Sequence, residues 1–307
     1  MNESARITSQ SSSPQSPSPQ SPSAQAADST AGTPGRPGLL LHLLILIGPF
    51  VALLLANLLI GGALQLLLPD DPDAPAWILT AIVVAQSAAV CGAVLVFCIL
   101  MLRAQGLTLR DAGLRWTSAS PLSLLAGIGI GAVVVLGVGL PLTWAGALRP
   151  TEGYGLPWWG LLIAGLAQAF LLQGFPEELL FRGYQMTALR LRPLAALWIS
   201  SAVFAVIHLI SSGGQQNALE HVLYLAVPFG FAVAGGALMI VLDSLWAAVG
   251  VHGGVHVGGL IGLAFGLGSG PAYWVISGLV WTLIGIALLA VAKRQGKLDG
   301  LWTGATR

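Results

Sequence analysis

The sequence predicts an all-α membrane protein with about eight transmembrane helices and a disordered N-terminal tail. Of its 307 residues, 55% are hydrophobic and only 8% are charged, whereas soluble domains average about 25% charged residues. Glycine accounts for 40 residues, and small residues let membrane helices approach one another closely. Apolar runs of about 20 residues, the length that spans a bilayer, recur along the chain.

A polar tail precedes these runs. Residues 1–38 contain the segment SSSPQSPSPQSPSAQ and are predicted to be disordered, because they lack the apolar side chains that a core needs. The first run begins too far from the N-terminus for a signal peptide and is predicted to be a retained span. The predicted spans are 39–68, 77–102, 121–148, 157–175, 194–210, 221–242, 244–268 and 272–292. Because 194–210 is near the lower length limit, seven spans is the alternative.

Basic residues predict the orientation of these spans. If the N-terminus is cytoplasmic and Arg182 is set aside, 11 of the remaining 12 Lys and Arg residues lie on the cytoplasmic side, with Arg149 as the exception. We therefore expect a multi-pass protein of the cell membrane with both termini in the cytoplasm. The lipid bilayer is therefore a predicted partner, and no nucleic acid is expected.

Ionisable residues interrupt three of the apolar segments. They are Glu177, Glu178, Arg182, His208, His252 and His256. Ionisable groups inside hydrocarbon are costly and usually functional, so we interpret all six as one hydrolytic site.

Helix rise places these residues at similar depths. A hairpin at Arg192–Pro193 returns His208 to the depth of Glu177, about 22 Å from its tip. A continuous helix from 157 to 192 would be about 54 Å long, so we expect a kink near Gly174–Pro176 or a protruding end.

Helical phase assigns roles within the acidic segment. Glu178 and Arg182 are four residues apart and share a face, so they are predicted to pair. Glu177 points about 100° away and is left free to act as a base. The alternative is that these acids only mark the start of a helix after Pro176.

The two later histidines also share a face. His252 and His256 are spaced i, i+4, as in helical metal sites and catalytic pairs. The alternative is a pair of structural histidines bonded to backbone carbonyls. A strip of glycines on the opposite side of the same span is predicted to pack against another helix; its members are Gly250, Gly254, Gly258, Gly262 and Gly266.

Three segments together resemble a known family. The motifs EELLFRG at 177–183, FAVIH at 204–208 and SLWAAVGVHGGVH at 244–256 are similar to those of the CPBP family of intramembrane proteases, which includes CAAX prenyl endopeptidases and bacteriocin-processing or immunity proteins. The resemblance covers about 157–268. It divides the chain into the tail at 1–38, N-terminal transmembrane helices at 39–156, a catalytic CPBP-like core at 157–292 and a short basic tail at 293–307.

The resemblance also implies roles for the six residues. Glu177 and His208 correspond to the pair that activates the attacking water, and Glu178 and Arg182 to its orienting partners. His252 matches the histidine of the third motif, whereas His256 stands where the family usually has asparagine. A protonated ring nitrogen at His256 can still donate a hydrogen bond to the oxyanion.

A metal-dependent mechanism is the second chemical hypothesis. Glu177, His208, His252 and His256 are acceptable ligands for Zn²⁺ or another divalent metal, and zinc lowers the pKa of its bound water to about 7. Three functions therefore compete. The first is an intramembrane endopeptidase, which under the metal hypothesis is a metalloprotease, and its partner is a peptide or lipidated protein substrate that is membrane-embedded or lipid-anchored and CAAX-like. The second is a non-catalytic peptide-binding immunity or scaffold protein, and the third is a transporter.

Overall fold

Eight helices of the described chain are long and apolar enough to cross a membrane, as predicted. The computed structural model describes residues 39–67, 74–151, 155–302 and 304, so the tail predicted at 1–38 lies outside the described residues. All the regular elements in these ranges are helices. The protein is therefore a multi-pass membrane protein.

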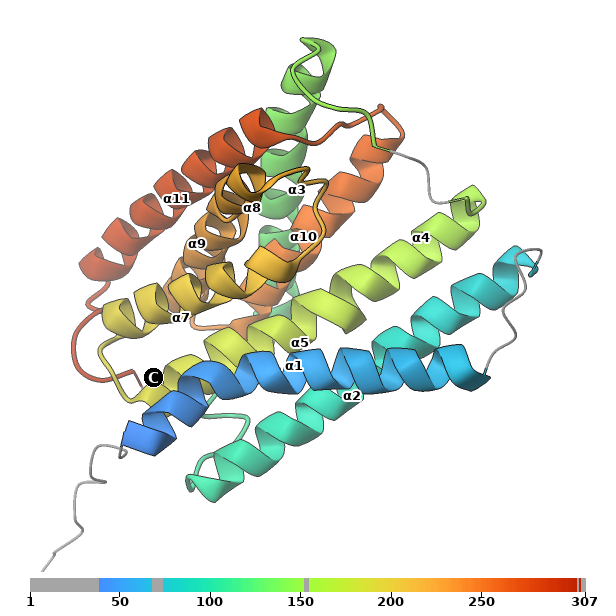
Figure 1. Cartoon of the computed structure of the whole chain (residues 1–307). Helices are drawn as coiled ribbons and strands as arrows, with labels where there is room; N and C mark the ends of the chain where they lie inside the picture. The colour runs from blue at the N-terminus through green and yellow to red at the C-terminus, as the bar shows by residue number, and fades with distance from the viewer. Residues whose placement is uncertain (1–38, 68–73, 152–154, 303, 305–307) are drawn as a thin grey trace, which may run out of the picture. The chain divides into compact units, whose positions relative to one another are not determined.

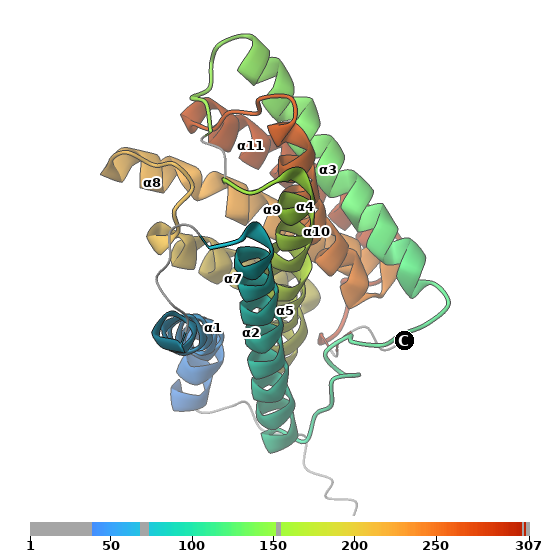
Figure 2. The same ribbon diagram turned by 90° about the vertical axis from the view of Figure 1, so that its right-hand side faces the viewer.

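The spans follow one another along the chain (Figures 1 and 2). The first three are α1 (Leu39–Leu67), α2 (Ala76–Ala104) and α3 (Ser120–Trp144). The fourth combines α4 (Trp158–Ala167), η1 (Gln168–Gly174), α5 (Phe175–Glu178), η2 (Leu179–Gln185) and α6 (Met186–Leu189). The remaining elements are α7 (Pro193–Ile207), η3 (His208–Ile210), α8 (Ala218–Tyr224), α9 (Ala226–Leu242), α10 (Leu245–Leu263) and α11 (Pro271–Arg294).

The fourth span continues past its predicted end. The sequence placed its boundary at residue 175, but helical backbone runs from Trp158 to Leu189. Two stretches of this span, η1 and η2, are π-helical, and the N–H of Phe175 donates to the carbonyl of Phe170, five residues back. The wider π turn accommodates the ring of Pro176, which would otherwise clash with the preceding turn. The predicted boundary is wrong because proline alters the winding here without ending the helix.

The composite fourth span packs between α2 and α10 (Figure 1). Its η2 stretch also holds α1 in place. Pro49 has no N–H, so the carbonyl of Ile45 loses its partner within α1. The side-chain amide of Gln185 donates to this carbonyl at 3.2 Å and to that of Leu46 at 3.0 Å. The backbone carbonyl that Pro49 leaves without a partner in α1 is therefore hydrogen-bonded by the fourth span, which attaches the two helices to each other.

Three members of the predicted glycine strip, Gly250, Gly254 and Gly258, pack against α3, whereas Gly262 meets Leu267 and Gly266 lies beyond the end of α10 with no described atom near its Cβ position. A Cβ atom added at Gly254 would collide with the backbone of Ile128, and one at Gly258 would lie 2.9 Å from Ala132. From the other side, a Cβ at Gly131 would lie 2.6 Å from the backbone of Gly254. The two backbones therefore touch directly, and the opposite face of α10 is left for its histidines.

An ion pair joins the segment that follows α3 to helix α8. The guanidinium of Arg149 donates to Glu220 Oε1 at 3.0 Å and to Oε2 at 2.8 Å, and also to the carbonyl of Gly214. These hydrogen bonds to Glu220 raise the pKa of Arg149. The lone basic residue that sequence analysis placed on this side is therefore a structural tie between loops.

The glycine contact is testable with two positions on the same helix. We expect Gly131→Ala to lower the thermal stability of the purified protein, because overpacking of this kind costs about 1–3 kcal/mol. Gly129→Ala is the control, since a Cβ at Gly129 meets no atom within 4 Å. Equal melting temperatures for the two variants would contradict the packing described here.

Candidate active site

Three elements bring the predicted site residues together. The composite fourth span carries Glu177 and Glu178 on α5 and Arg182 on η2, and all three side chains are buried. His208 ends α7, where the helix tightens into the 3₁₀ turn η3. His252 and His256 lie on the face of α10 away from α3.

Glu178 is the centre of this cluster. Its Oε2 atom lies 3.1 Å from Arg182 Nε, which is the predicted i, i+4 ion pair. Its Oε1 atom lies 2.9 Å from Nδ1 of His252. A carboxylate accepts hydrogen bonds, so Nδ1 of His252 carries the proton and Nε2 is left with its lone pair. Sequence reasoning predicted the first of these contacts and missed the second.

Glu177 faces the free nitrogen of His252. The Oε2 atom of Glu177 lies 3.9 Å from His252 Nε2, and within the described residues this buried oxygen has no hydrogen-bond partner. A buried carboxylate oxygen without a partner is costly and rare in folded proteins. Glu177 thus lies beside the Glu178–Arg182 ion pair with one buried oxygen open to a further partner, and its role as a base stays a prediction.

Arg182 is stabilised by charge and by an aromatic ring. Its side chain is fully buried, and its Cζ atom lies 4.4 Å from the centroid of the Phe204 ring. None of its three guanidinium nitrogens forms a hydrogen bond with another described residue. The carboxylate of Glu178 and the face of Phe204 therefore balance this cation.

Phe204 is a site residue that sequence reasoning missed. Its ring lies 4.6 Å from the ring of His208 and 6.0 Å from that of His252, measured between centroids. The backbone carbonyl of Phe204 also lies 2.7 Å from His208 Nδ1, which fixes that nitrogen as the donor. Its place four residues before His208 in the FAVIH segment was the available signal. The described contacts join His208 to the cluster through Phe204 and include no hydrogen bond or ion pair between His208 and Glu177.

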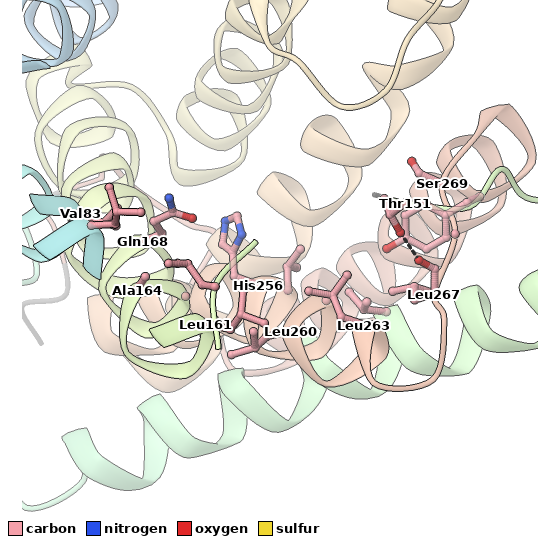
Figure 3. Close-up of a pocket in the computed structure, with 18 residues that line it drawn as sticks. Val83, Thr151, Leu161, Ala164, Gln168, His256, Leu260, Leu263, Leu267 and Ser269 are labelled. Atoms are coloured by element: carbon pink, nitrogen blue, oxygen red, sulfur yellow. Dashed lines mark hydrogen bonds between the residues drawn. The ribbon is translucent and has the colours of Figure 1, made fainter. Parts of the chain in front are cut away.

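His256 connects the cluster to a cavity. Its ring stacks on that of His252 with centroids 5.4 Å apart and planes 20° apart, as their i, i+4 spacing predicts. It also lines a cavity of about 540 Å³ that lies between α4 and α10 (Figure 3). Most of the cavity wall is aliphatic, including Leu161, Leu260 and Leu263. A ligand in this cavity would lie one helical turn from His252.

The predicted metal site has no preformed geometry. Across the described ranges, no group of three or more His, Cys, Asp or Glu side chains is arranged to hold a metal ion. Glu178 and the Phe204 carbonyl engage the Nδ1 atoms of His252 and His208, so Nε2 is the nitrogen of each ring that is free to coordinate. Because the described side chains do not converge as a ligand set, we derive no step through a metal.

All six residues lie within a segment that matches a known family. Residues 157–258 match the family model for type II CAAX prenyl endopeptidase Rce1-like proteins. No curated protein and no solved structure gives a match to the chain. The chain therefore combines eight candidate membrane spans with a buried cluster of Glu, Arg and His side chains. The matched segment contains all three motifs and is similar to type II CAAX prenyl endopeptidases, which agrees with the resemblance that the motifs carry.

The buried ion pair gives a stability prediction. Replacing Arg182 with Met should destabilise the protein by about 3–5 kcal/mol, because the Glu178 carboxylate is left buried without its cation. Arg192→Met, which changes an exposed arginine, is the control and should leave thermal unfolding unchanged. Adding Glu178→Gln to Arg182→Met should restore part of the loss. An Arg182→Met protein as stable as wild type would show that the charges are not coupled.

Proposed function

We propose that the protein is an intramembrane endopeptidase that hydrolyses a peptide bond in a membrane-embedded or lipid-anchored, CAAX-like substrate. The observation that carries this proposal is the Oε2 atom of Glu177, which forms no hydrogen bond with a described residue and lies 3.9 Å from His252 Nε2. A general base must lie within hydrogen-bonding distance of the water whose proton it takes. Glu177 Oε2 and His252 Nε2 are two neighbouring acceptors that one water molecule can bridge.

The hydrogen bonds support different roles for His252 and His208 on the one hand and for His256 on the other. Nδ1 is the donor in both His252 and His208, so the Nε2 atom of each is an acceptor while the ring is neutral. These two rings suit water activation with Glu177. His256 has no such constraint and lies at the cavity, so we assign to it the hydrogen bond to the developing oxyanion.

In the proposed reaction, Glu177 takes a proton from water as the water oxygen attacks the substrate carbonyl carbon. The carbonyl π electrons move to oxygen, and His256 donates a hydrogen bond to that oxyanion. Collapse of the tetrahedral intermediate breaks the C–N bond, and the proton held by Glu177 passes to the leaving amine. Glu178 and Arg182 hold His252 in the required tautomer and orientation.

Glu177→Gln is the direct test of this mechanism. The substitution keeps the shape of the side chain but removes the base, so cleavage should fall by at least about 100-fold while thermal stability is retained. The assay uses an internally quenched peptide that ends in Cys-aliphatic-aliphatic-X, with and without a farnesyl thioether. Asp299→Asn changes an exposed carboxylate and should cleave at the wild-type rate.

Two results would change the proposal. Equal cleavage by wild type and Glu177→Gln would remove Glu177 from the mechanism, and no cleavage by wild type would favour the non-catalytic peptide-binding function. Metal analysis of the same preparations tests the zinc hypothesis. Stoichiometric zinc that is lost from His256→Asn together with activity would make His256 a ligand.

We also propose that both termini are cytoplasmic, from the distribution of Lys and Arg. In a variant with Cys91→Ala and Cys98→Ala, a single cysteine at exposed Arg192 should be protected from an impermeant thiol reagent in intact cells. A cysteine at exposed Ser212, at the other end of α7, should be labelled. The reverse pattern would invert the topology.

A further inference from the structure

A second polar side chain faces the cavity beside His256. Gln168 is the first residue of the π-helical stretch η1 and lines the cavity together with His256 (Figure 3). Its labelled neighbours on this part of the wall are Val83, Leu161, Ala164 and Leu260. The carboxamide of Gln168 is exposed and forms no hydrogen bond with another described residue.

The depth of Gln168 makes this exposure significant. It lies ten residues into the fourth span, which begins at Trp158, or about 15 Å from the helix end. That distance is about half the thickness of the hydrocarbon layer. An amide without a hydrogen-bond partner is unfavourable at this depth. Packing against apolar walls alone does not explain a carboxamide at this position.

We infer that Gln168 is a substrate-binding residue that hydrogen-bonds the backbone of the peptide next to its scissile bond. A carboxamide offers one acceptor and two donors, and a peptide unit presents the matching N–H and C=O. The labelled neighbours of Gln168 on this part of the wall are aliphatic apart from His256, and the other polar lining residues are Thr151, Ser269 and Tyr273. This inference rests on the proposed function, because the substrate it concerns is the one that Glu177 is proposed to cleave.

The geometry also assigns Gln168 a positioning role and not a catalytic one. His256 stacks on His252 and lines the cavity with Gln168, so a peptide bonded to Gln168 passes His256 within one helical turn of the catalytic cluster. Gln168 therefore positions the chain, while His256 and Glu177 act on the carbonyl. The expected signature is a change in substrate affinity larger than the change in kcat.

The test uses Gln168→Met, which keeps the length of the side chain but removes its hydrogen-bonding groups. The matched control is Gln173→Met, on the same π-helical stretch, because Gln173 is not one of the residues that line the cavity. Binding of the farnesylated peptide and of its unprenylated twin is measured by fluorescence anisotropy in the Glu177→Gln background. Gln168→Met should weaken binding about tenfold, as expected for one or two lost hydrogen bonds, and Gln173→Met should not.

Backbone N-methylation of the peptide separates recognition from a structural effect. Methylation of the amide that bonds Gln168 should weaken binding to the protein with Gln168 about tenfold and have no further effect on Gln168→Met. Equal affinity of the Gln168→Met and Gln168 proteins, or equal sensitivity of both to every methylation, would overturn the inference. Absence of any peptide binding would overturn it too.

Because binding is read without turnover, the two proposals fail differently. A wild-type protein that does not cleave the peptide, combined with weaker binding by Gln168→Met, would reject the peptidase mechanism and keep the role of Gln168. Normal cleavage and binding by Gln168→Met would reject the role of Gln168 and keep the peptidase mechanism.

Discussion

The buried carboxylate of Glu178 is the interaction on which the site depends. It joins Arg182 of its own span to His252 of α10, with contacts of 3.1 and 2.9 Å. A carboxylate and a guanidinium cost several kcal/mol each to bury, so such a pair persists only when both are compensated. The compensation comes from different elements, because α10 supplies an imidazole and α7 supplies the aromatic face of Phe204. The same group therefore fixes a histidine tautomer and ties three helices at one point.

Close approach of the backbones makes this contact possible. A Cβ at Gly253 of α10 would collide with the ring of Phe170, and one at Gly174 would lie 3.3 Å from the backbone nitrogen of Gly253. These two glycines let the helix that carries Glu177 lie directly against the helix that carries His252. On the far side of α10, the glycine interface with α3 sets the rotation of the helix. Packing on one face thus determines where the imidazoles of the other face point.

Much of this arrangement could be predicted from the sequence because it follows from local periodicity and from the membrane. Eight spans follow from hydropathy, since a helix satisfies its own backbone hydrogen bonds in lipid. The Glu178–Arg182 pair and the His252–His256 stack follow from i, i+4 spacing. The π-helical winding around Pro176 could not be read in this way, because apolar periodicity does not report which turn carries an i→i+5 bond.

The remaining features needed tertiary contacts between distant segments. Nothing in its own segment indicates that Glu178 reaches His252 across 74 residues. Phe204 and Gln168 are ordinary residues in apolar runs until packing places one between two imidazoles and the other at a cavity. Sequence reasoning selected residues by charge, so it found the acids, the arginine and the histidines and passed over a phenylalanine and a neutral amide.

The hydrogen-bond directions suggest a division of the site into two sides. On the side of the buried cluster, His252 and His208 both present acceptor nitrogens, next to the carboxylate of Glu177. Acceptors suit the removal of a proton from water but repel a developing oxyanion. Under the proposed mechanism the donors come from the cavity side, whose polar lining side chains are those of His256, Gln168, Thr151, Ser269 and Tyr273. A substrate that entered through the cavity would meet donors first and the base beyond them, which is the order that attack on a carbonyl requires.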